Sequence, residues 1–214
     1  MLFSFSILTT HHHWDHAHGN SKLLKLQPGL TVYGGSDRVQ SVTKVIKDEQ
    51  PFKLGQLQVQ PLLTPGHTME HVCYYVQDPT TQEACVFTGD CLFSSGAGKF
   101  FEGPAEVMHG ALAKLKQLPK DTIVYFGHEY TVSNCRFLLD HIEPDNKELQ
   151  QKLTWAQAVG CTTPSTILNE LQTNSFLRTD NATVRKSVAK PGEDPSALSD
   201  IDVLGRVRYI KDHA

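Results

Sequence analysis

The sequence lacks the features that would assign the protein to a membrane or nucleic-acid-binding class. Its 214 residues contain no apolar run as long as a membrane span. The formal net charge of −3 gives no general attraction to nucleic acid or to a membrane surface. The N-terminal stretch Leu2–Leu8 is short and has no basic residue before it, which is not typical of a signal peptide. We therefore expect a small-molecule partner, with a local cationic cluster for any anionic ligand.

Cysteine is scarce, and its positions are scattered without paired spacings: Cys73, Cys85, Cys91, Cys135 and Cys161. An odd, dispersed set indicates reduced thiols rather than a disulfide framework, so we expect a cytoplasmic location. Histidine, in contrast, is abundant. Six of the 11 histidines fall within the first 67 residues, which first suggests a metal site.

The first 130 residues alternate short β-like runs with turns. The strand candidates are rich in Val, Ile, Phe and Tyr, and most are bounded by turn residues: Phe3–Leu8, Leu30–Tyr33, Leu57–Leu63, His71–Val76, Ala84–Phe87 and Ile123–Phe126. Two segments, Ser36–Ile46 and Ala105–Leu118, are predicted helices.

After about Tyr130 the pattern becomes helical. The predicted helices are Val132–His141, Lys147–Ala158, Ser165–Leu171 and Asp200–Lys211, with a polar, turn-rich stretch at Thr179–Ser199. We expect Thr163 or Ser165 to cap the third helix. The sequence thus predicts an α+β fold, with a catalytic domain over residues 1–130 and a small helical region over residues 131–214.

The strongest motif is a His-x-His-x-Asp-His pattern formed by His11, His13, Asp15 and His16. Imidazole and carboxylate groups are suitable ligands for zinc and related divalent ions. Further candidates follow three other strand-like runs, each directly after a glycine: His67, Asp90 and His128. Loops after several strands can converge at one edge of a sheet, so we expect these seven side chains to meet.

The order of these residues resembles the metallo-β-lactamase superfamily. The finer strings THHHWDHAHGN, TPGHTMEH, FTGDCLF, GAGKF and GHEYT closely resemble glyoxalase II, the hydroxyacylglutathione hydrolase family. The resemblance implies an αββα sandwich and hydrolysis of glutathione thioesters such as S-lactoylglutathione, in methylglyoxal detoxification. It also implies that one metal ion is bound by His11, His13 and His67, a second by Asp15, His16 and His128, and both by the bridging Asp90.

Two such ions, zinc before iron or manganese, suggest a mechanism. A shared water with its pKa lowered toward about 7 would attack the thioester carbonyl as hydroxide, while one ion stabilises the oxyanion. The leaving thiol has an ordinary pKa of about 8.5, so it needs no strong general acid. We therefore expect Asp15 and Asp90 to be the catalytic carboxylates. The sequence has no Gly-x-Ser-x-Gly motif for a serine route.

The resemblance assigns glutathione binding to Lys99, Tyr130, Arg208 and Lys211, with Phe101 in a position where the family typically has tyrosine. Taken alone, the cations would be ordinary surface residues, although Arg208 and Lys211 would share one helical face. The missing hydroxyl at Phe101 removes one hydrogen bond, worth roughly 0.5–1.5 kcal/mol. Two further departures are Cys91, where we expect threonine, and His18, where we expect glycine. Cys91 has a packing role or a direct chemical one, and His18 strains the loop or points outward.

Only nine residues precede the His-rich motif, whereas family members carry several strands there. The chain thus resembles an N-terminally shortened monomeric member, and we expect its sheet to have an open edge. Three alternatives remain: another hydrolase of the superfamily, a persulfide dioxygenase with a single iron, and an inactive or weakly active paralogue that binds metal. The intact second ligand set (Asp15, His16 and His128) argues against the dioxygenase.

Overall fold

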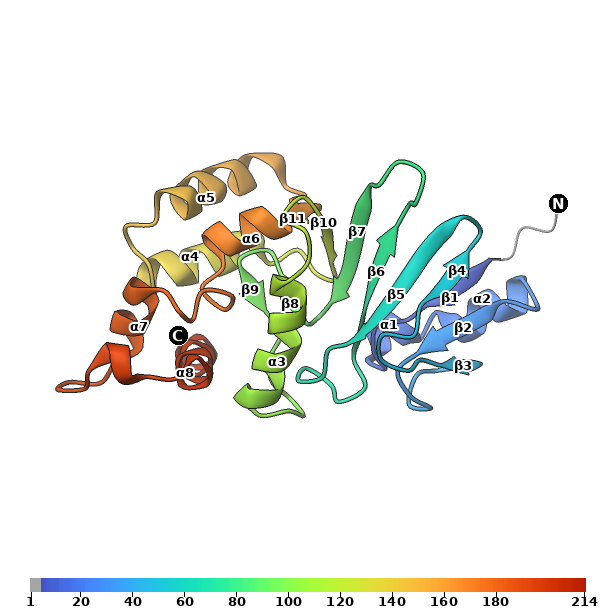
Figure 1. The fold of residues 1–214 in the computed structure, drawn as a ribbon, viewed down its shortest axis with the longest axis horizontal. Coiled ribbons are helices and arrows are strands. Elements are labelled where there is room, and N and C mark those ends of the chain that lie inside the picture. Colours follow the sequence, from blue (N-terminus) through green and yellow to red (C-terminus); the bar gives the residue numbers. More distant parts are fainter. Residues whose placement is uncertain (1–4) are drawn as a thin grey trace.

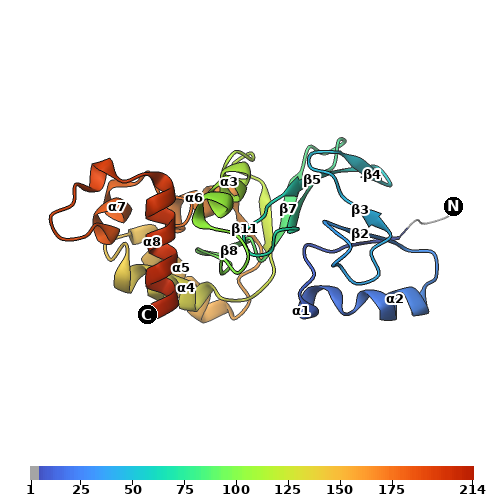
Figure 2. The same cartoon turned by 90° about the horizontal axis from the view of Figure 1, so that it is seen from below.

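Two β-sheets pack face to face in residues 5–214, the part of the chain that the computed structural model describes. Helices α1 (Trp14–Ala17) and α2 (Asn20–Leu26) lie outside the smaller sheet, as Figure 2 shows. The helices of the second half of the chain lie beyond the larger sheet (Figure 1). The layers are therefore helix, sheet, sheet, helix, which confirms the predicted αββα arrangement followed by a helical region.

The smaller sheet has three parallel strands in the order β1 (Ser6–Leu8), β2 (Thr31–Gly34) and β3 (Lys44–Val45). Its inner face contributes Tyr33 to a buried cluster that also contains Val59, Val72 and Tyr74 of the larger sheet. The Tyr74 hydroxyl donates to the Thr9 carbonyl at 2.9 Å. Apolar burial and this hydrogen bond together fix the start of the His-rich loop against the larger sheet.

The larger sheet has six strands in the order β11 (Ser165–Thr166), β10 (Ile123–Phe126), β7 (Ala84–Gly89), β6 (Val72–Gln77), β5 (Leu57–Leu63) and β4 (Phe52–Leu54). Strands β10 and β7 are parallel, whereas β6 is antiparallel to both β7 and β5. The carboxyl ends of β5, β7 and β10 therefore meet at one edge of the sheet, and the loops that follow them can share a site.

The helical layer covers the other face of the larger sheet. Its elements are α3 (Ala105–Lys116), α4 (Thr131–His141), α5 (Lys147–Val159), α6 (Ile167–Thr173), α7 (Ala182–Val188), the 3-10 turn η1 (Pro195–Ala197) and α8 (Asp200–His213). In α3 the buried residues Met108, Leu112 and Leu115 repeat at helical spacing and enter the main core. A capping box between Ser199 and Asp202 starts α8.

The predicted helix over Ser36–Ile46 is wrong: this segment is a series of turns that ends in β3. The Ser36 hydroxyl accepts from the Arg38 amide, a local bond that competes with a helix. The Thr43 amide donates to the Val32 carbonyl at 2.9 Å and so joins the segment to β2. Tertiary pairing therefore overrides the periodic pattern.

Two details of the second half also differ from the prediction. The polar stretch Thr179–Ser199 contains α7, whose first amides are capped by the Asn181 side chain, and the turn η1. Helix α6 begins at Ile167 with Thr166 as its cap, because residues 165–166 pair with β10 instead. A strand pairing of two residues leaves no sequence pattern to detect.

Strand β1 lies at one edge of the three-stranded sheet within residues 5–214, which agrees with the expected open edge. The rings of Phe87 in β7 and Tyr125 in β10 stack at 5.2 Å and are exposed. They line a hollow of about 340 Å³ beside Leu8 and Tyr74. No helix within residues 5–214 has the length and hydropathy needed to cross a membrane.

Candidate metal centre

The His-rich loop follows β1 directly and is held in place by the larger sheet. The Thr10 carbonyl accepts from the Val72 amide at 2.8 Å. His11 is fully buried, and its Nε2 lies 3.1 Å from Nδ1 of His13. The short helix α1 then carries Asp15 and His16. One loop thus presents four side chains to the same region.

The other three candidates follow β5, β7 and β10, the strands whose carboxyl ends share an edge. His67 Nε2 lies 3.0 Å from Nδ1 of His13. His128 Nε2 lies 3.1 Å from Nε2 of His16 and 3.2 Å from a carboxylate oxygen of Asp15. The structure therefore brings together all seven side chains named by the sequence.

Three overlapping groups have ligand atoms within 4.8 Å of one another: His11, His13 and His67; Asp15, His16 and His128; and His11, His16 and Asp90. Asp90 lies between the first two groups. Its Oδ1 is 3.1 Å from Nε2 of His16, and its Oδ2 is 3.4 Å from Nε2 of His128 and 3.6 Å from Nε2 of His67. Asp90 is therefore close to histidines of both groups.

The electrostatics of the cluster fit divalent cations. Burial, reinforced by the neighbouring imidazoles, holds the pKa of His11 far below its ordinary value. Burial also lowers the pKa of His67 to about 4, so both rings are neutral and offer lone pairs. The buried Oδ1 of Asp90 lies 3.1 Å from Nε2 of His16, but no donor among the described residues meets it in hydrogen-bond geometry. Tetrahedral ligands at 2.0–2.1 Å from zinc are about 3.3 Å apart, close to the separations here.

Two glycines permit this close approach. A Cβ atom at Gly127 would lie 2.5 Å from Oδ1 of Asp90, and one at Gly98 would lie 1.9 Å from the Asp90 carbonyl oxygen. Both distances are shorter than real contacts allow, so larger residues would displace Asp90.

Several supporting residues were not singled out by the sequence analysis. Buried His71 accepts from the Asp90 amide at 3.2 Å through Nε2, while its Nδ1 contacts the Thr64 hydroxyl at 2.9 Å. Glu129 accepts from the Thr162 amide at 2.7 Å, which fixes the chain next to His128. His71 is the last residue of the family-like string TPGHTMEH. The pairing of Glu129 with Thr162, in contrast, leaves no pattern in the sequence.

A second unpredicted cluster holds the outer side of the loop. Arg38 donates to both oxygens of Glu102, at 2.6 and 2.8 Å, and to Glu70 at 3.2 Å. Glu70 in turn accepts from the His12 amide at 3.1 Å. These contacts connect the turns after β2 to the His-rich loop and to the segment after Lys99.

Two aromatic rings predicted to bind substrate lie beside the cluster. The Phe101 ring is 60% exposed, and its centroid lies 5.3 Å from that of His67. The Tyr130 ring is 47% exposed and stacks on His128 at 5.2 Å. The Lys99 carbonyl lies 2.9 Å from Nδ1 of His67, so the segment that carries Lys99 and Phe101 borders the cluster.

Arg208 of α8 is buried and Lys211 is partly buried, contrary to their interpretation in isolation as surface residues. Arg208 is 8% exposed, and it donates to the Ala97 carbonyl at 3.3 Å and pairs with Asp212 at 2.7 Å. Lys211 donates to Oδ1 of Asn134, and burial lowers its pKa to about 8. Arg208 thus contacts the hairpin of β8 (Leu92–Phe93) and β9 (Gly96–Ala97), which leads to Lys99. Lys211 is connected to the same hairpin through Asn134, which donates to the Ser94 carbonyl at 3.0 Å.

The two departures from the family pattern have simple structural outcomes. His18 is exposed in ordinary helical conformation and stacks on Trp14 at 5.1 Å, so it points outward. Cys91 is fully buried in the main core next to Cys73, which agrees with a packing role.

Comparisons with known proteins agree with this architecture. Residues 129–214 match the family model described as hydroxyacylglutathione hydrolase C-terminus. The chain is 46% identical to the cytoplasmic hydroxyacylglutathione hydrolase of Arabidopsis thaliana, over 96% of this chain and 80% of the relative. It is 39% identical to a hydroxyacylglutathione hydrolase-like protein of Gallus gallus, over 97% and 73% of the two chains.

A solved structure shows the same fold at lower identity. The metallo-beta-lactamase of Staphylococcus aureus superposes with a TM-score of 0.60 at 20% identity, over 98% of this chain and 57% of the other. The fold is therefore that of the metallo-β-lactamases. Because the identity to the plant relative is high over nearly the whole chain, the protein belongs to the hydroxyacylglutathione hydrolase family.

Proposed function

We propose that the protein hydrolyses glutathione thioesters, such as S-lactoylglutathione, with two divalent metal ions. The observation that carries this proposal is the pair of three-residue ligand groups with Asp90 close to histidines of both. The names of its relatives supply the substrate class. The buried Oδ1 of Asp90, which lacks a hydrogen bond among residues 5–214, supports a cation between the two groups.

In this proposal one ion is held by His11, His13 and His67, the other by Asp15, His16 and His128, and Asp90 joins both. Zinc is the first candidate for these ligands, with iron or manganese next. The ions would supply an activated water and a Lewis acid for the thioester carbonyl. Asp15 and Asp90 would supply the negative charge beside the ions and help to orient that water. The thiolate leaves without a general acid because the pKa of a thiol is only about 8.5.

The glutathione part would lie between the cluster and the hairpin. Its carboxylates need cations. Lys99 follows the hairpin and its carbonyl meets His67, Arg208 donates to Ala97 in the hairpin, and Lys211 donates to Asn134. The rings of Phe101 and Tyr130 border the cluster from different elements. They offer apolar walls for the acyl group or the cysteinyl part of the substrate.

One alternative also has support: a weakly active metal-binding relative. The edge position of β1 exposes sheet backbone, and Phe101 lacks a hydroxyl that could bind substrate. A single-iron dioxygenase is less favoured because Asp15, His16 and His128 complete a second ligand group. For location we propose the cytoplasm, supported by the five free cysteines and by the name of the plant relative.

The test is to purify the chain with zinc, count the ions per chain, and follow the loss of S-lactoylglutathione absorbance. We expect close to two ions and steady turnover. A folded protein that holds two ions without turnover would support the inactive alternative. One iron per chain with oxygen uptake would support the dioxygenase.

A further inference from the structure

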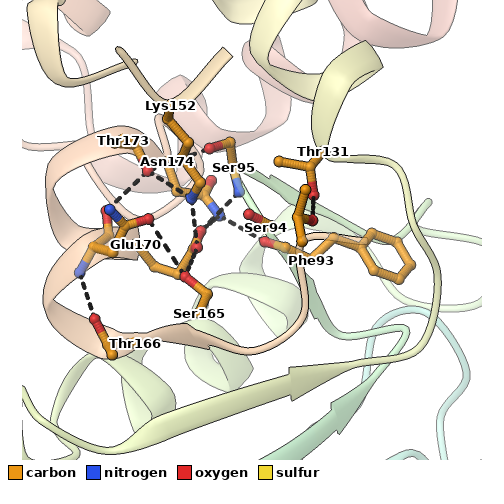
Figure 3. A network of polar contacts seen from close by, with 12 residues as sticks. Phe93, Ser94, Ser95, Thr131, Lys152, Ser165, Thr166, Glu170, Thr173 and Asn174 are labelled. Atoms are coloured by element: carbon orange, nitrogen blue, oxygen red, sulfur yellow. Dashed lines mark hydrogen bonds and ion pairs between the residues drawn. The ribbon is translucent and has the colours of Figure 1, made fainter. Parts of the chain in front are cut away.

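A buried ion pair lies in the helical layer, away from the seven proposed ligands. Lys152 of α5 donates to Oε1 of Glu170 in α6 at 2.8 Å, and Glu170 is completely buried (Figure 3). Ser165 donates to the same oxygen at 2.5 Å, and Lys152 also donates to Thr173 at 3.0 Å. Removing two charges from water costs several kcal/mol per ion, so such a pair is weak evidence for stability and calls for another role.

The second oxygen of Glu170 faces the β8–β9 hairpin. Its Oε2 accepts from the Ser95 amide at 2.7 Å and from the Asn174 side chain at 3.1 Å. Asn174 also donates to the carbonyls of Phe93 at 3.2 Å and Gly96 at 3.0 Å. Figure 3 shows these groups converging on the turn. Ser95 has a φ of 53°, a left-handed conformation that is costly for serine and must be held by such contacts.

The hairpin connects two parts of the proposed active site. Its first strand begins two residues after Asp90, and its second strand ends two residues before Lys99. The return is tight, because a Cβ at Gly98 would lie 1.9 Å from the Asp90 carbonyl oxygen. The Lys99 carbonyl then meets Nδ1 of His67 at 2.9 Å. The position of the turn therefore determines where Lys99 lies relative to the metal ligands.

We propose that Lys152 and Glu170 are positioning residues. Through Asn174 and the Ser95 amide they fix the hairpin, and thereby set the place of Lys99 for the glutathione part of the substrate. The expected change in KM rests on the proposed function, because it needs the glutathione thioester as substrate. The expected change in hairpin mobility does not depend on that function. The inference requires that loosening the turn weaken substrate binding while the ions remain bound.

The substitution Glu170→Gln tests this directly. A glutamine has one acceptor oxygen, and the unpaired ammonium of Lys152 would cost more than an unpaired amide, so the oxygen should face Lys152. The new NH2 group then faces the N–H of Ser95, donor against donor. The variant therefore releases the hairpin while it keeps the shape of the side chain.

The matched control is Glu143→Gln. Glu143 is also a buried carboxylate in the helical layer, paired with Arg178 at 2.9 Å and with Ser175 at 2.6 Å. None of its described contacts reaches the hairpin. If Glu170 has a merely structural role, both variants should lose stability and should have the same Michaelis constant.

We expect Glu170→Gln to raise KM for S-lactoylglutathione about three- to tenfold with two ions still bound, and to leave kcat within about twofold. Glu143→Gln should leave KM within about twofold. Hydrogen exchange of the amides in residues 92–99 should accelerate in Glu170→Gln and not in the control. If Glu170→Gln fails to fold, Asn174→Ala, which removes two hairpin bonds and no charge, should give the same shifts.

Equal KM values and equal hydrogen exchange in the Glu170 and Glu143 variants would overturn the inference. If Asn174→Ala is used instead, an unchanged KM and unchanged exchange in that variant would overturn it. The outcome is separable from the proposed function. If the unmodified protein has no turnover, the proposed function fails, and exchange together with calorimetric binding of glutathione still decides whether Glu170 positions the hairpin.

Discussion

Charged groups are treated differently in the sheet half and in the helical half of the molecule. In the helical half, buried charges are neutralised by partners within the chain, as in Lys152 with Glu170 and Arg178 with Glu143. At the edge of the sheet, the neutral imidazoles of His11 and His67 lie close to the buried carboxylate of Asp90, whose Oδ1 contacts His16 at 3.1 Å but meets no described donor in hydrogen-bond geometry. The cluster at the sheet edge offers ligand atoms to a cation, whereas the ion pairs of the helical half already supply both charges themselves.

The largest test of this contrast is Asp90→Asn. Loss of the shared negative charge should remove one ion per chain and lower kcat about a thousandfold or more, because two-metal chemistry supplies several kcal/mol. Metal analysis and thioester turnover measure both effects. Asp180→Asn, at an exposed ion pair with Lys116, should change neither. Full activity in Asp90→Asn would contradict the shared-carboxylate site.

A smaller effect is expected from His71→Ala. His71 holds the Asp90 amide and is not among the proposed ligands. Outer partners of metal ligands typically contribute 10–100-fold in affinity, so zinc affinity should fall by roughly that factor. Competition with a chromophoric chelator measures it. The exposed His141→Ala is the control, and equal affinities in the two variants would show that His71 does not support the site.

The substitution Phe101→Tyr tests whether a hydroxyl at this position improves substrate binding. The ring already lies beside His67, and a hydroxyl would add one donor worth roughly 0.5–1.5 kcal/mol. We expect KM for S-lactoylglutathione to fall by up to about tenfold, with unchanged metal content. Steady-state kinetics of the two proteins give the answer. An unchanged KM would mean that this position does not contact the substrate.

The smallest effect concerns Glu102, whose pKa is lowered to about 2 by the hydrogen bond and charge of Arg38. Because the folded pKa lies below the unfolded value of about 4.5, this pair stabilises the fold above about pH 4.5 and loses that contribution as the pH falls toward 2. The pair is partly exposed, so its contribution is below about 1 kcal/mol. Urea unfolding of Glu102→Gln should show a small loss at pH 7 that disappears near pH 2. A loss that is independent of pH would contradict this account.

The sequence predicted the seven convergent side chains because each follows a recognisable strand and sits in a recognisable string. The ranges of β5 and β10 were also predicted in full. In the helical half, the family resemblance pointed to Arg208 and Lys211, but the sequence did not predict the partners of Arg208 or Glu170, because packing between segments far apart in the chain sets them. The wrong helix at residues 36–46 has the same cause, since the bond from Thr43 to Val32 is tertiary. The boundary between the two predicted domains stays a prediction.

The strand directions in the larger sheet place the proposed site and the β6–β7 turn at opposite ends of the strands. Strands β5, β7 and β10 end at the edge with the cluster, so the turn between β6 and β7, at residues 78–83, lies at the opposite edge. That turn is exposed around Thr80–Gln82. A fluorophore, a surface tether or a fused reporter attached there would stay remote from the reacting groups, and new chain termini opened at this turn should leave their arrangement intact.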